Sequence, residues 1–402
     1  MKTTLENKNL TICLEGRIDS NNASAVEQEI MSAVRNEPGA NVVLDADKLE
    51  YISSAGLRML MKLRKQAGTA LPILNVSRDV YDVFDITGFT ELFDIHRRLR
   101  QVSIDGCEMI GRGGNGAVYR LDQETILKLY NEGTSLEKIA LEKKYATAAF
   151  TAGLPCAIAY ETVQSGNQYG IVFELLNAVM AGRAVNEDPA LIPEMGKSMG
   201  KLLRQLHTTE MPPGVLPKMT DKMTAWIDYL EEKYLDHADA GLMRSVLAAI
   251  PEKNTLVHAD FHEGNVMLQG NELILIDLDD ICIGHPLFDL VAHYAGHVLA
   301  AKTAPEGMRN SMGMEVETGL SMYRHTVQAY LGTDDAQQLA AYEQSMQLLT
   351  LFYTMIYLAK GKDSKNLTPD RVKGVLAQVL PQFRQMAPLI CQMVQEFPHV
   401  GA

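Results

Sequence analysis

Cysteine is scarce in this chain, and no two cysteines stand at the spacing of a C-x-x-C motif. The cysteines are odd in number and widely scattered: Cys13, Cys107, Cys156, Cys282 and Cys391. A set without that motif gives no indication of a zinc site or a redox centre. We therefore expect buried free thiols in a protein of a reducing compartment.

Long apolar segments are also missing. No run reaches the roughly 18 apolar residues of a membrane-spanning helix. The opening residues, MKTTLENKNLTICLEG, are too polar for the hydrophobic part of a secretory signal. These absences predict a cytoplasmic protein with no membrane partner.

Positive charge is in deficit. The formal net charge is -13, and most of the excess acid lies after residue 98. Such a surface repels a phosphate backbone and favours a cationic substrate. We therefore expect no nucleic-acid partner.

Two domains are expected, because 402 residues exceed one ordinary core. In the N-terminal part, predicted strands alternate with predicted helices, which is typical of an α/β layer structure. The strands are expected at 10–16, 41–46 and 71–76, and a helix is expected at 23–35. Residues 79–95 are expected to form a helix, a break at Gly88 and a short final element, while LEYISSAGLRML is expected to be a loop that opens into a helix.

A basic segment without apolar periodicity, HRRLRQVSIDG at 96–106, marks the predicted domain boundary. Beyond it, strand character at 107–130 and 156–175 surrounds a predicted helix at 135–150. From about residue 190 the pattern is mainly helical, with a β-rich stretch at 255–281. This order predicts a small sheet-based lobe followed by a large helical lobe.

A glycine-rich segment, IGRGGNGAVY, opens the second domain. It holds Gly111, Gly113 and Gly116, with Val118 two residues beyond. Such glycines let backbone N–H groups lie close over phosphates. A simple glycine-rich turn and a dinucleotide-binding loop are the alternatives. The predicted strand that follows, YRLDQETILKLY, argues against the dinucleotide-binding loop, which would lead into a helix.

Lys128 lies in that strand between two leucines, so its side chain points away from theirs. A solvated surface lysine is the ordinary interpretation, but this position could also hold ATP phosphates. Glu142, in the helix after it, could then hold Lys128 in an ion pair. Glu137 is the competing partner. We favour Glu142 because apolar side chains share its helix face.

The strongest pattern is VHADFHEGNV followed by LILIDLDD. It supplies Asp260, Asn265 five residues later, and Asp277 after a hydrophobic strand. Phosphoryl transfer needs a group that orients the attacking hydroxyl and oxygen ligands for Mg²⁺. An acidic hairpin with capping residues is the alternative interpretation.

These residues resemble the aminoglycoside phosphotransferase and choline kinase family, a branch of the protein-kinase-like fold, over about residues 105–402. The family motif H-x-D-x-x-x-x-N is matched by His258, Asp260 and Asn265, and its I-D motif by Asp277. The resemblance implies that Asp260 is catalytic, that Asn265 and Asp277 bind Mg²⁺, and that His258 is a scaffold of the catalytic loop.

The same resemblance implies ATP as the cofactor, bound by the glycine loop and by Lys128 with Glu142. Glu174 resembles the hinge residue beside which the backbone would meet adenine. Asp279 could assist the metal or the substrate, whereas Asp280 is expected to be a solvated turn residue. Asp289 is expected to be a helix N-cap and His207 a satisfied core histidine.

Protein kinases carry a long segment ending in A-P-E after the metal-binding aspartate, and it forms the peptide platform. Here only eleven residues separate Asp277 from Asp289, and no A-P-E follows. A small hydroxylated molecule is therefore the expected acceptor. The residues at about 180–250 and the helices after 310 are expected to form its pocket.

Residues 1–98 resemble the STAS family of anti-sigma-factor antagonists through LEGRID, LEYISSAGLR and VFDITGF. In that family a serine of a D-S-[ST]-G loop is phosphorylated by a partner kinase. Ser54 occupies that position and is the candidate phospho-acceptor, although Ser53 replaces the usual aspartate. The alternative is that Ser54 only caps the following helix.

The predicted fold is thus an α/β STAS-like module, residues 1–98, and an α+β bilobal protein-kinase-like domain, residues 105–402. Its small β-rich lobe is expected at about 105–176 and its large helical lobe at about 177–402. The predicted function is ATP-dependent phosphotransfer to a hydroxyl of a small molecule, regulated or localised by the STAS-like module and a protein partner. The rivals are a partner-switching protein with a nucleotide-binding pseudokinase domain and a protein serine kinase acting on STAS serines.

Overall fold

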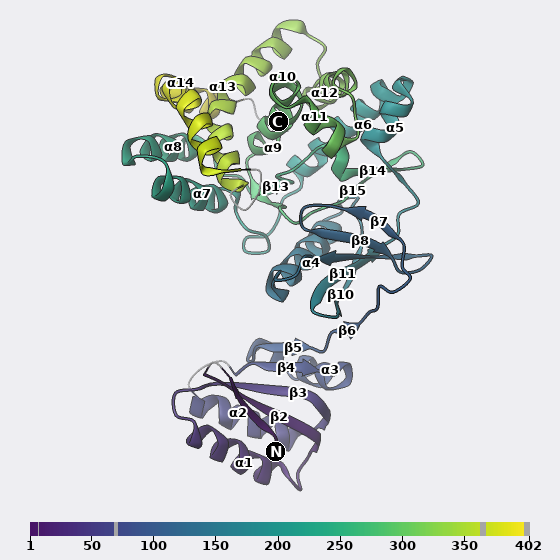
Figure 1. Cartoon of the computed structure of the whole chain (residues 1–402), viewed down its shortest axis with the longest axis vertical. Coiled ribbons are helices and arrows are strands. Elements are labelled where there is room, and N and C mark those ends of the chain that lie inside the picture. Colours follow the sequence, from purple (N-terminus) through teal and green to yellow (C-terminus); the bar gives the residue numbers. More distant parts are fainter. Residues whose placement is uncertain (7, 68–70, 362–366, 398–402) are drawn as a thin grey trace. The chain divides into compact units, whose positions relative to one another are not determined.

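The computed structural model of the chain describes residues 1–6, 8–67, 71–361 and 367–397 (Figure 1). The chain divides into two compact units, one of Met1–Ser103 with Val163–Gly166 and one of Ile104–Thr162 with Asn167–Ala402. The large apolar core of each unit is built from its own residues. Residues 398–402, the end of the predicted second domain, lie outside the described residues.

The N-terminal unit is built on five strands: Thr3–Glu6 (β1), Asn9–Ile18 (β2), Asn41–Ile52 (β3), Ile73–Val76 (β4) and Ile95–Arg97 (β5). They lie in the order β1-β2-β3-β4-β5, with β1 antiparallel to β2 and the other neighbours parallel. Helices Ala23–Asn36 (α1) and Ser54–Ala67 (α2) lie side by side along the sheet (Figure 1). The connection from β4 to β5 contains Arg78–Ile86 (α3) and the short helix Phe89–Glu91 (η1).

In this sheet, buried and more exposed side chains alternate along the strands. In β2 the side chains of Leu10, Ile12 and Leu14 are buried at every second position. The expected loop at Leu49–Ile52 is wrong, because these residues extend β3 and pair in parallel with the end of β2. Strand β1 was not predicted.

The β-rich lobe of the second unit contains Met109–Arg112 (β7), Gly116–Arg120 (β8), Thr125–Tyr130 (β9), helix Leu136–Thr151 (α4), Ala159–Ser165 (β10) and Gln168–Glu174 (β11). Arg100–Gln101 (β6) is counted with the first unit, as is the end of β10 with which it pairs. The strand order is β6-β10-β11-β9-β8-β7. The expected single strand YRLDQETILKLY is two strands, because the Asp122 carboxylate accepts the N–H groups of Glu124 and Thr125 and closes a turn.

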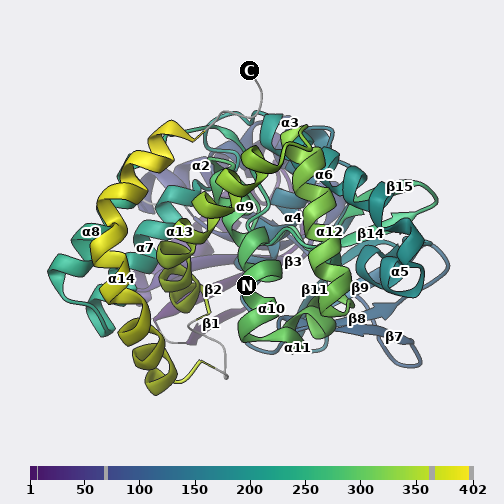
Figure 2. The ribbon, with the colours of Figure 1, turned by 90° about the horizontal axis from the view of Figure 1, so that it is seen from above.

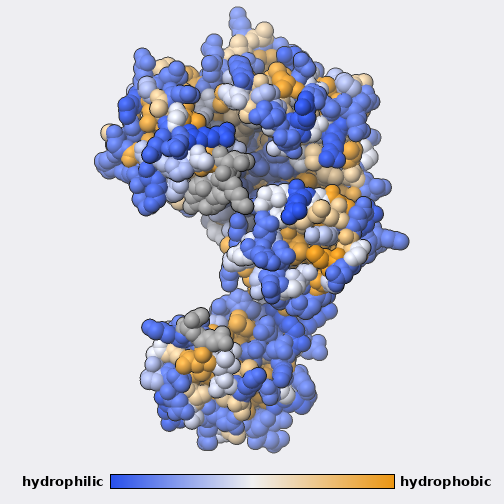
Figure 3. Space-filling model, in the orientation of Figure 1, coloured by the Kyte–Doolittle hydropathy of each residue, from blue (hydrophilic) through white to orange (hydrophobic). Residues whose placement is uncertain are grey.

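One face of this lobe is markedly apolar. Figure 3 shows hydrophobic side chains over β7, β8 and β11. The exposed apolar residues here include Met109 and Ile110, which lie in β7 beside the glycine loop.

The helical lobe contains small β elements that carry the Asp260 and Asp277 motifs. These are Val179–Met180 (β12), Thr255–Val257 (β13), the short helix Glu263–Asn265 (η3), Val266–Gln269 (β14), Glu272–Leu275 (β15) and Cys282–Gly284 (β16). Strands β12-β14-β15 form one sheet and β13-β16 another. The loop around Asp260 follows β13 and the turn around Asp277 follows β15, each where the chain passes from one of these sheets to the other.

Helices pack around these elements (Figures 1 and 2). Figure 2 shows the last helix beside α8 and α13, while α12 lies along α6. Among the described residues, no helix combines the length and the apolar character that a membrane span requires. The helices are Ala181–Glu187 (α5), Pro189–Leu191 (η2), Ile192–Thr208 (α6), Met219–Lys233 (α7), His237–Ala249 (α8), Leu287–Tyr294 (α9), the π-helix Ala295–Leu299 (η4), Ala300–Thr303 (α10), Pro305–Gly307 (α11), the π-helix Met308–Met312 (η5), Val316–Leu331 (α12), Ala336–Lys360 (α13) and Pro369–Glu396 (α14).

Candidate active site

Lys128 joins the two lobes of the second unit through two carboxylates. Its Nζ lies 2.8 Å from Glu142 Oε1 and 2.6 Å from Asp277 Oδ1. The side chain of Glu142 is 5% exposed and that of Asp277 is 42% exposed. Glu142, and not the alternative Glu137, is therefore the partner on α4. The half-exposed Asp277 is the member of the trio that faces solvent.

The electrostatics keep Lys128 charged. Burial alone would lower its pKa, but Asp277 and Glu142 outweigh that effect and raise it. A permanent ammonium beside an accessible carboxylate is suited to holding phosphate oxygens together with a cation.

The glycine loop is shaped by steric contact as well as by turn geometry. Gly113 donates its N–H to the carbonyl of Gly116, and Val118 pairs across β8 and β9 with Lys128. A Cβ at Gly116 would lie only 2.0 Å from the Leu129 carbonyl oxygen. Gly111 lies in β7 opposite Val118. This arrangement requires glycine at position 116.

Asn115, at the tip of the loop, was not predicted as a site residue. Its Nδ2 donates to Asp279 Oδ2 at 3.1 Å. Burial, together with the neighbouring Asp277 and Asp280, raises the pKa of Asp279 to about 7. The turn after β15 therefore places the carboxyl groups of Asp277, Asp279 and Asp280 close together, with Asp279 bonded to the glycine loop. Such a group of oxygen atoms attracts a cation.

Asp260 lies in the loop between β13 and η3, with a half-exposed side chain. Burial opposes its charge, but hydrogen bonding to His262 and the charge of Lys360 prevail and lower its pKa. The Lys360 Nζ lies 4.0 Å from Asp260 Oδ1. Asp260 is therefore a carboxylate at neutral pH, able to accept a hydrogen bond from a hydroxyl.

Asn265 and Asp277 fit a hard cation. The Asn265 Nδ2 donates to the Asp260 carbonyl at 3.0 Å, which leaves its amide oxygen for a ligand. The Ile276 N–H donates to the Asn265 carbonyl at 2.9 Å, so Asn265 and Asp277 lie on adjoining segments. Asp277 has a φ of 59° and Ala259, next to Asp260, has a φ of 65°, so both lie in the left-handed region. Such strained backbone is typical of functional loops.

Asp289 anchors the loop before Asp260, and the prediction that it is an N-cap is wrong. Its carboxylate accepts the N–H groups of His258 and Ala259 at 2.8 and 2.7 Å and lies 3.1 Å from His207 Nε2. The helix α9 instead begins after Pro286. The inward-pointing Asp289 carboxylate therefore satisfies buried backbone N–H groups of the loop.

Two buried histidines flank this anchor. His207 lies between Asp289 and the hydroxyl of Tyr330, so it is a satisfied core histidine as expected. His258 is fully buried, with its ring edge-on to Phe261. Burial lowers the pKa of His258 and keeps it neutral. Its position inside the loop is compatible with the predicted scaffold role.

Asp280 is not the solvated turn residue that the sequence suggested. Its carboxylate lies 2.8 Å from Lys360 Nζ and 3.2 Å from Lys222 Nζ. Lys360 also donates to the Ala259 carbonyl at 3.0 Å. Sequence reasoning missed both lysines, because they come from α7 and α13 and no local motif marks them.

Glu174 ends β11. Its carboxylate accepts the Ile158 N–H at 2.8 Å, and its own N–H donates to the Ile158 carbonyl. The Leu175 N–H donates to the Glu124 carbonyl at the start of the connection to the helical lobe. Glu174 is thus held by hydrogen bonds from both its carboxylate and its backbone, at the start of the connection to the helical lobe.

In the N-terminal unit, Ser54 is exposed in the first turn of α2. The capping interpretation of Ser54 is wrong, because Ser53 performs that task. The Ser53 carbonyl accepts the Leu57 N–H and its Oγ accepts the Ala55 N–H. The Ser54 hydroxyl is therefore not engaged as the helix cap.

Comparisons with known proteins address both units. The model of the STAS domain matches residues 2–102, and the model described as the phosphotransferase enzyme family matches residues 107–310. The putative anti-sigma factor antagonist BtrV of Bordetella bronchiseptica is 36% identical over 100 residues, which are 24% of this chain and 85% of that protein.

Solved structures that resemble the chain have lower identity. The gentamicin complex of APH(2")-IIa has 14% identity and a TM-score of 0.46, covering 69% of this chain and 91% of that one. A choline/ethanolamine kinase family protein from Mesorhizobium loti has 18% identity and a TM-score of 0.44, covering 72% and 92%. Because both scores are below 0.5, the assignment depends on the family matches.

Proposed function

The chain belongs to the phosphotransferase enzyme family through residues 107–310 and carries a STAS domain at residues 2–102, and we propose that it transfers the γ-phosphate of ATP to a hydroxyl of a small molecule. The observation that carries this proposal is the convergence of Lys128, Asp277 and Asn265 beside an ionised Asp260. A nucleotide-binding protein without catalysis has no need of a carboxylate in that position.

Asp260 orients the acceptor. As a carboxylate it accepts the hydrogen bond of the attacking hydroxyl and takes its proton as the new O–P bond forms. Its pKa is low, so it acts mainly by positioning rather than by removing the proton in advance. Lys360 and Asp289 hold the loop that carries it.

Lys128 would hold the phosphates of ATP, kept in place by Glu142. Asn265 and Asp277 would hold Mg²⁺, which when bound neutralises charge on the transferred phosphoryl group. The glycine loop would cover the phosphates with backbone N–H groups, and the connection after Glu174 would meet the adenine.

A small acceptor is favoured by the segment that follows Asp277. Residues 281–290 are all buried and pass directly from β16 into α9. They cannot form the exposed platform on which a protein kinase lays a peptide. The pocket for the acceptor is expected between the helices at about 180–250 and those after 310.

The STAS domain would regulate or localise this activity through a partner protein. The match to an anti-sigma factor antagonist and the exposed Ser54 hydroxyl support this part of the proposal. Phosphorylation there would add negative charge to a docking surface at the start of a helix.

The deciding experiment measures ATP consumption by the full-length protein with a panel of alcohols that includes aminoglycosides, choline, sugars and homoserine. We expect one class to stimulate turnover in the wild type and in Asp334→Asn, an exposed control. Asp260→Asn should abolish the stimulation. Turnover that is equally fast in Asp260→Asn would contradict the proposal.

A further inference from the structure

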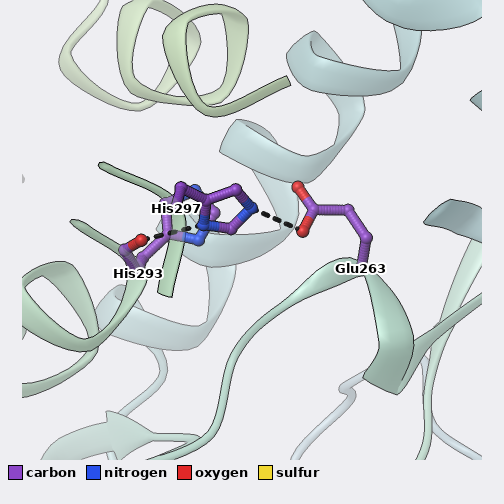
Figure 4. Close-up of side chains that lie close together, drawn as sticks. All are labelled: Glu263, His293 and His297. Atoms are coloured by element: carbon purple, nitrogen blue, oxygen red, sulfur yellow. Dashed lines mark hydrogen bonds and ion pairs between the residues drawn. The ribbon is translucent and has the colours of Figure 1, made fainter. Parts of the chain in front are cut away.

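A second cluster of metal-ligating side chains lies behind the catalytic loop. It comprises Glu263 from η3, His293 from α9 and His297 from η4, all essentially without solvent exposure. One ligand atom from each lies within 4.8 Å of the others. Figure 4 shows the His297 imidazole pointing toward the Glu263 carboxylate, with His293 beside it. None of these residues has a role in the phosphotransfer proposed above.

The cluster leaves polar atoms unsatisfied. Glu263 Oε1 and both ring nitrogens of His293 are buried without a hydrogen bond of normal geometry in the part of the chain that the structure describes. The Phe261 backbone lies near His293, but the geometry between them is not that of a normal hydrogen bond. Buried polar atoms without a partner are destabilising, so this arrangement is suited to a ligand that engages all of them.

The hydrogen bonds of His297 narrow the choice of ligand. Its Nδ1 lies 2.8 Å from the His293 carbonyl, which can only accept, so Nδ1 carries a proton. In the neutral ring, Nε2 then presents a lone pair to Glu263 Oε2 at 2.8 Å. Two acceptors at that distance require a proton or a cation. A proton would satisfy this pair alone, whereas a metal ion could also engage His293.

The helix geometry aligns the two imidazoles. His293 and His297 are four residues apart, where α9 passes into the π-helix η4, and their ring centroids lie 4.2 Å apart. Short π-helical turns are frequent at functional sites. The backbone hydrogen bond to His297 Nδ1 is also the outer contact that orients metal-ligating histidines.

We propose that Glu263, His293 and His297 bind one divalent transition-metal ion of the zinc type. Two imidazoles and one carboxylate are a common zinc ligand set, whereas Mg²⁺ prefers oxygen ligands alone. Ligands about 2.0–2.1 Å from a tetrahedral zinc ion are about 3.3 Å apart, so small side-chain adjustments complete the site. Three protein ligands leave the fourth position for a water molecule, and the burial of all three ligands favours a role in holding the loop over one in catalysis.

The ion would link the loop that carries Asp260 to helices α9 and η4. Glu263 lies between Asp260 and Asn265 in the sequence, and it is joined to a helix about 30 residues further on. The residues next to Glu263 are closely packed, since a Cβ at Gly264 would lie 1.9 Å from the Ser311 carbonyl oxygen. Metal binding would therefore fix the spacing of the two residues proposed to act on hydroxyl and Mg²⁺.

The test uses the full-length protein with Zn²⁺ or Co²⁺ as the probe. After loading and removal of excess metal, we expect one Zn²⁺ per chain that persists in millimolar Mg²⁺, and a Co²⁺ absorption spectrum typical of a site with nitrogen and oxygen ligands. Glu263→Gln and His297→Gln should lose both signals. His237→Gln, which changes an exposed histidine paired with Glu231, should keep them.

Asp277→Asn separates this proposal from the proposed function, since it should lose Mg²⁺–ATP binding but keep the tight metal. Wild-type protein that retains no stoichiometric Zn²⁺, and whose unfolding midpoint followed at Trp226 is unchanged by Zn²⁺, would overturn the proposal without any variant. Binding lost in His237→Gln but retained in His297→Gln would overturn it as well.

Discussion

Asp260 acts on the acceptor in the proposed mechanism and does not hold the nucleotide. Asp260→Asn removes the carboxylate but preserves its shape, so turnover should fall by about 10² or more, as for other positioned acid–base groups. Calorimetry should show ATP binding unchanged. Normal turnover in this variant would mean that the catalytic loop is wrongly assigned.

Lys128, in contrast, is proposed to hold the nucleotide and not to act on the acceptor. Lys128→Ala should weaken ATP binding about ten- to hundredfold, the range expected for the loss of charged hydrogen bonds. The exposed Lys144→Ala on α4 is the matched control and should bind as the wild type does. Calorimetry in the presence of Mg²⁺ compares the two. Equal affinities would exclude Lys128 as the phosphate-binding cation.

Asp289 is expected to determine stability. Asp289→Asn places an amide donor against buried N–H donors, and the loss should be about 3–5 kcal/mol, as when a buried ionic network is broken. The chain has a single tryptophan, Trp226 in α7. Its fluorescence during denaturation therefore reports on the helical lobe, where Asp289 lies. An unchanged transition would contradict the anchoring role.

The same residue predicts a pH dependence. Burial alone would raise the pKa of Asp289, but the His207 hydrogen bond and nearby charges and N–H groups lower it. A lowered folded pKa contributes stability that is complete above the ordinary value of about 3.9 and is lost as the pH falls through the folded value. The difference between wild type and Asp289→Asn should thus be largest near neutral pH and shrink in acid. A difference that grew on acidification would contradict this sign.

At the scale of elements, substitution by alanine should affect stability differently at Gly113 and Gly116 of the glycine-rich segment. Gly116→Ala drives a Cβ into the Leu129 carbonyl and should separate β8 from β9, at a cost of about 1–3 kcal/mol. Gly113→Ala meets no atom within 4 Å and should leave stability unchanged. Thermal unfolding of both variants makes the comparison. Equal destabilisation would show that steric contact with β9 is not the reason for Gly116.

At the scale of the whole molecule, residues 1–103 should fold alone. Their sheet, α1 and α2 form a core of their own, from Leu10 to Phe93. Because this segment lacks tryptophan, circular dichroism of the isolated fragment is the suitable measurement. We expect mixed helix and strand signals and a cooperative thermal transition. A fragment without either would contradict the boundary at Ser103.

Ser54 should not be the main phosphate acceptor of this enzyme. The buried segment after Asp277 offers no peptide platform, and Ser54 lies within a helical first turn that would have to open. Full-length protein incubated with labelled ATP should therefore incorporate little label. Rapid stoichiometric labelling that disappears in both Ser54→Ala and Asp260→Ala would favour the protein-kinase alternative.

The sequence by itself determined the parts of the site that lie within one short segment. The glycine loop, Lys128 and the run from His258 to Asn265 each depend on turns and strands a few residues long, so their spacing carries the geometry. The alternation of strands and helices before residue 98 likewise predicted an α/β unit, because side-chain periodicity follows backbone geometry.

Only the tertiary structure decided which distant groups meet. Asp289 accepts a hydrogen bond from the backbone of His258, about 30 residues earlier in the chain. Lys222 and Lys360, which lie on separate helices, both pair with Asp280. The buried cluster of Glu263 with His293 and His297 arises in the same way. Such contacts depend on how helices pack around a shared core, and a periodic pattern specifies which face of a helix is buried but not which partner it meets.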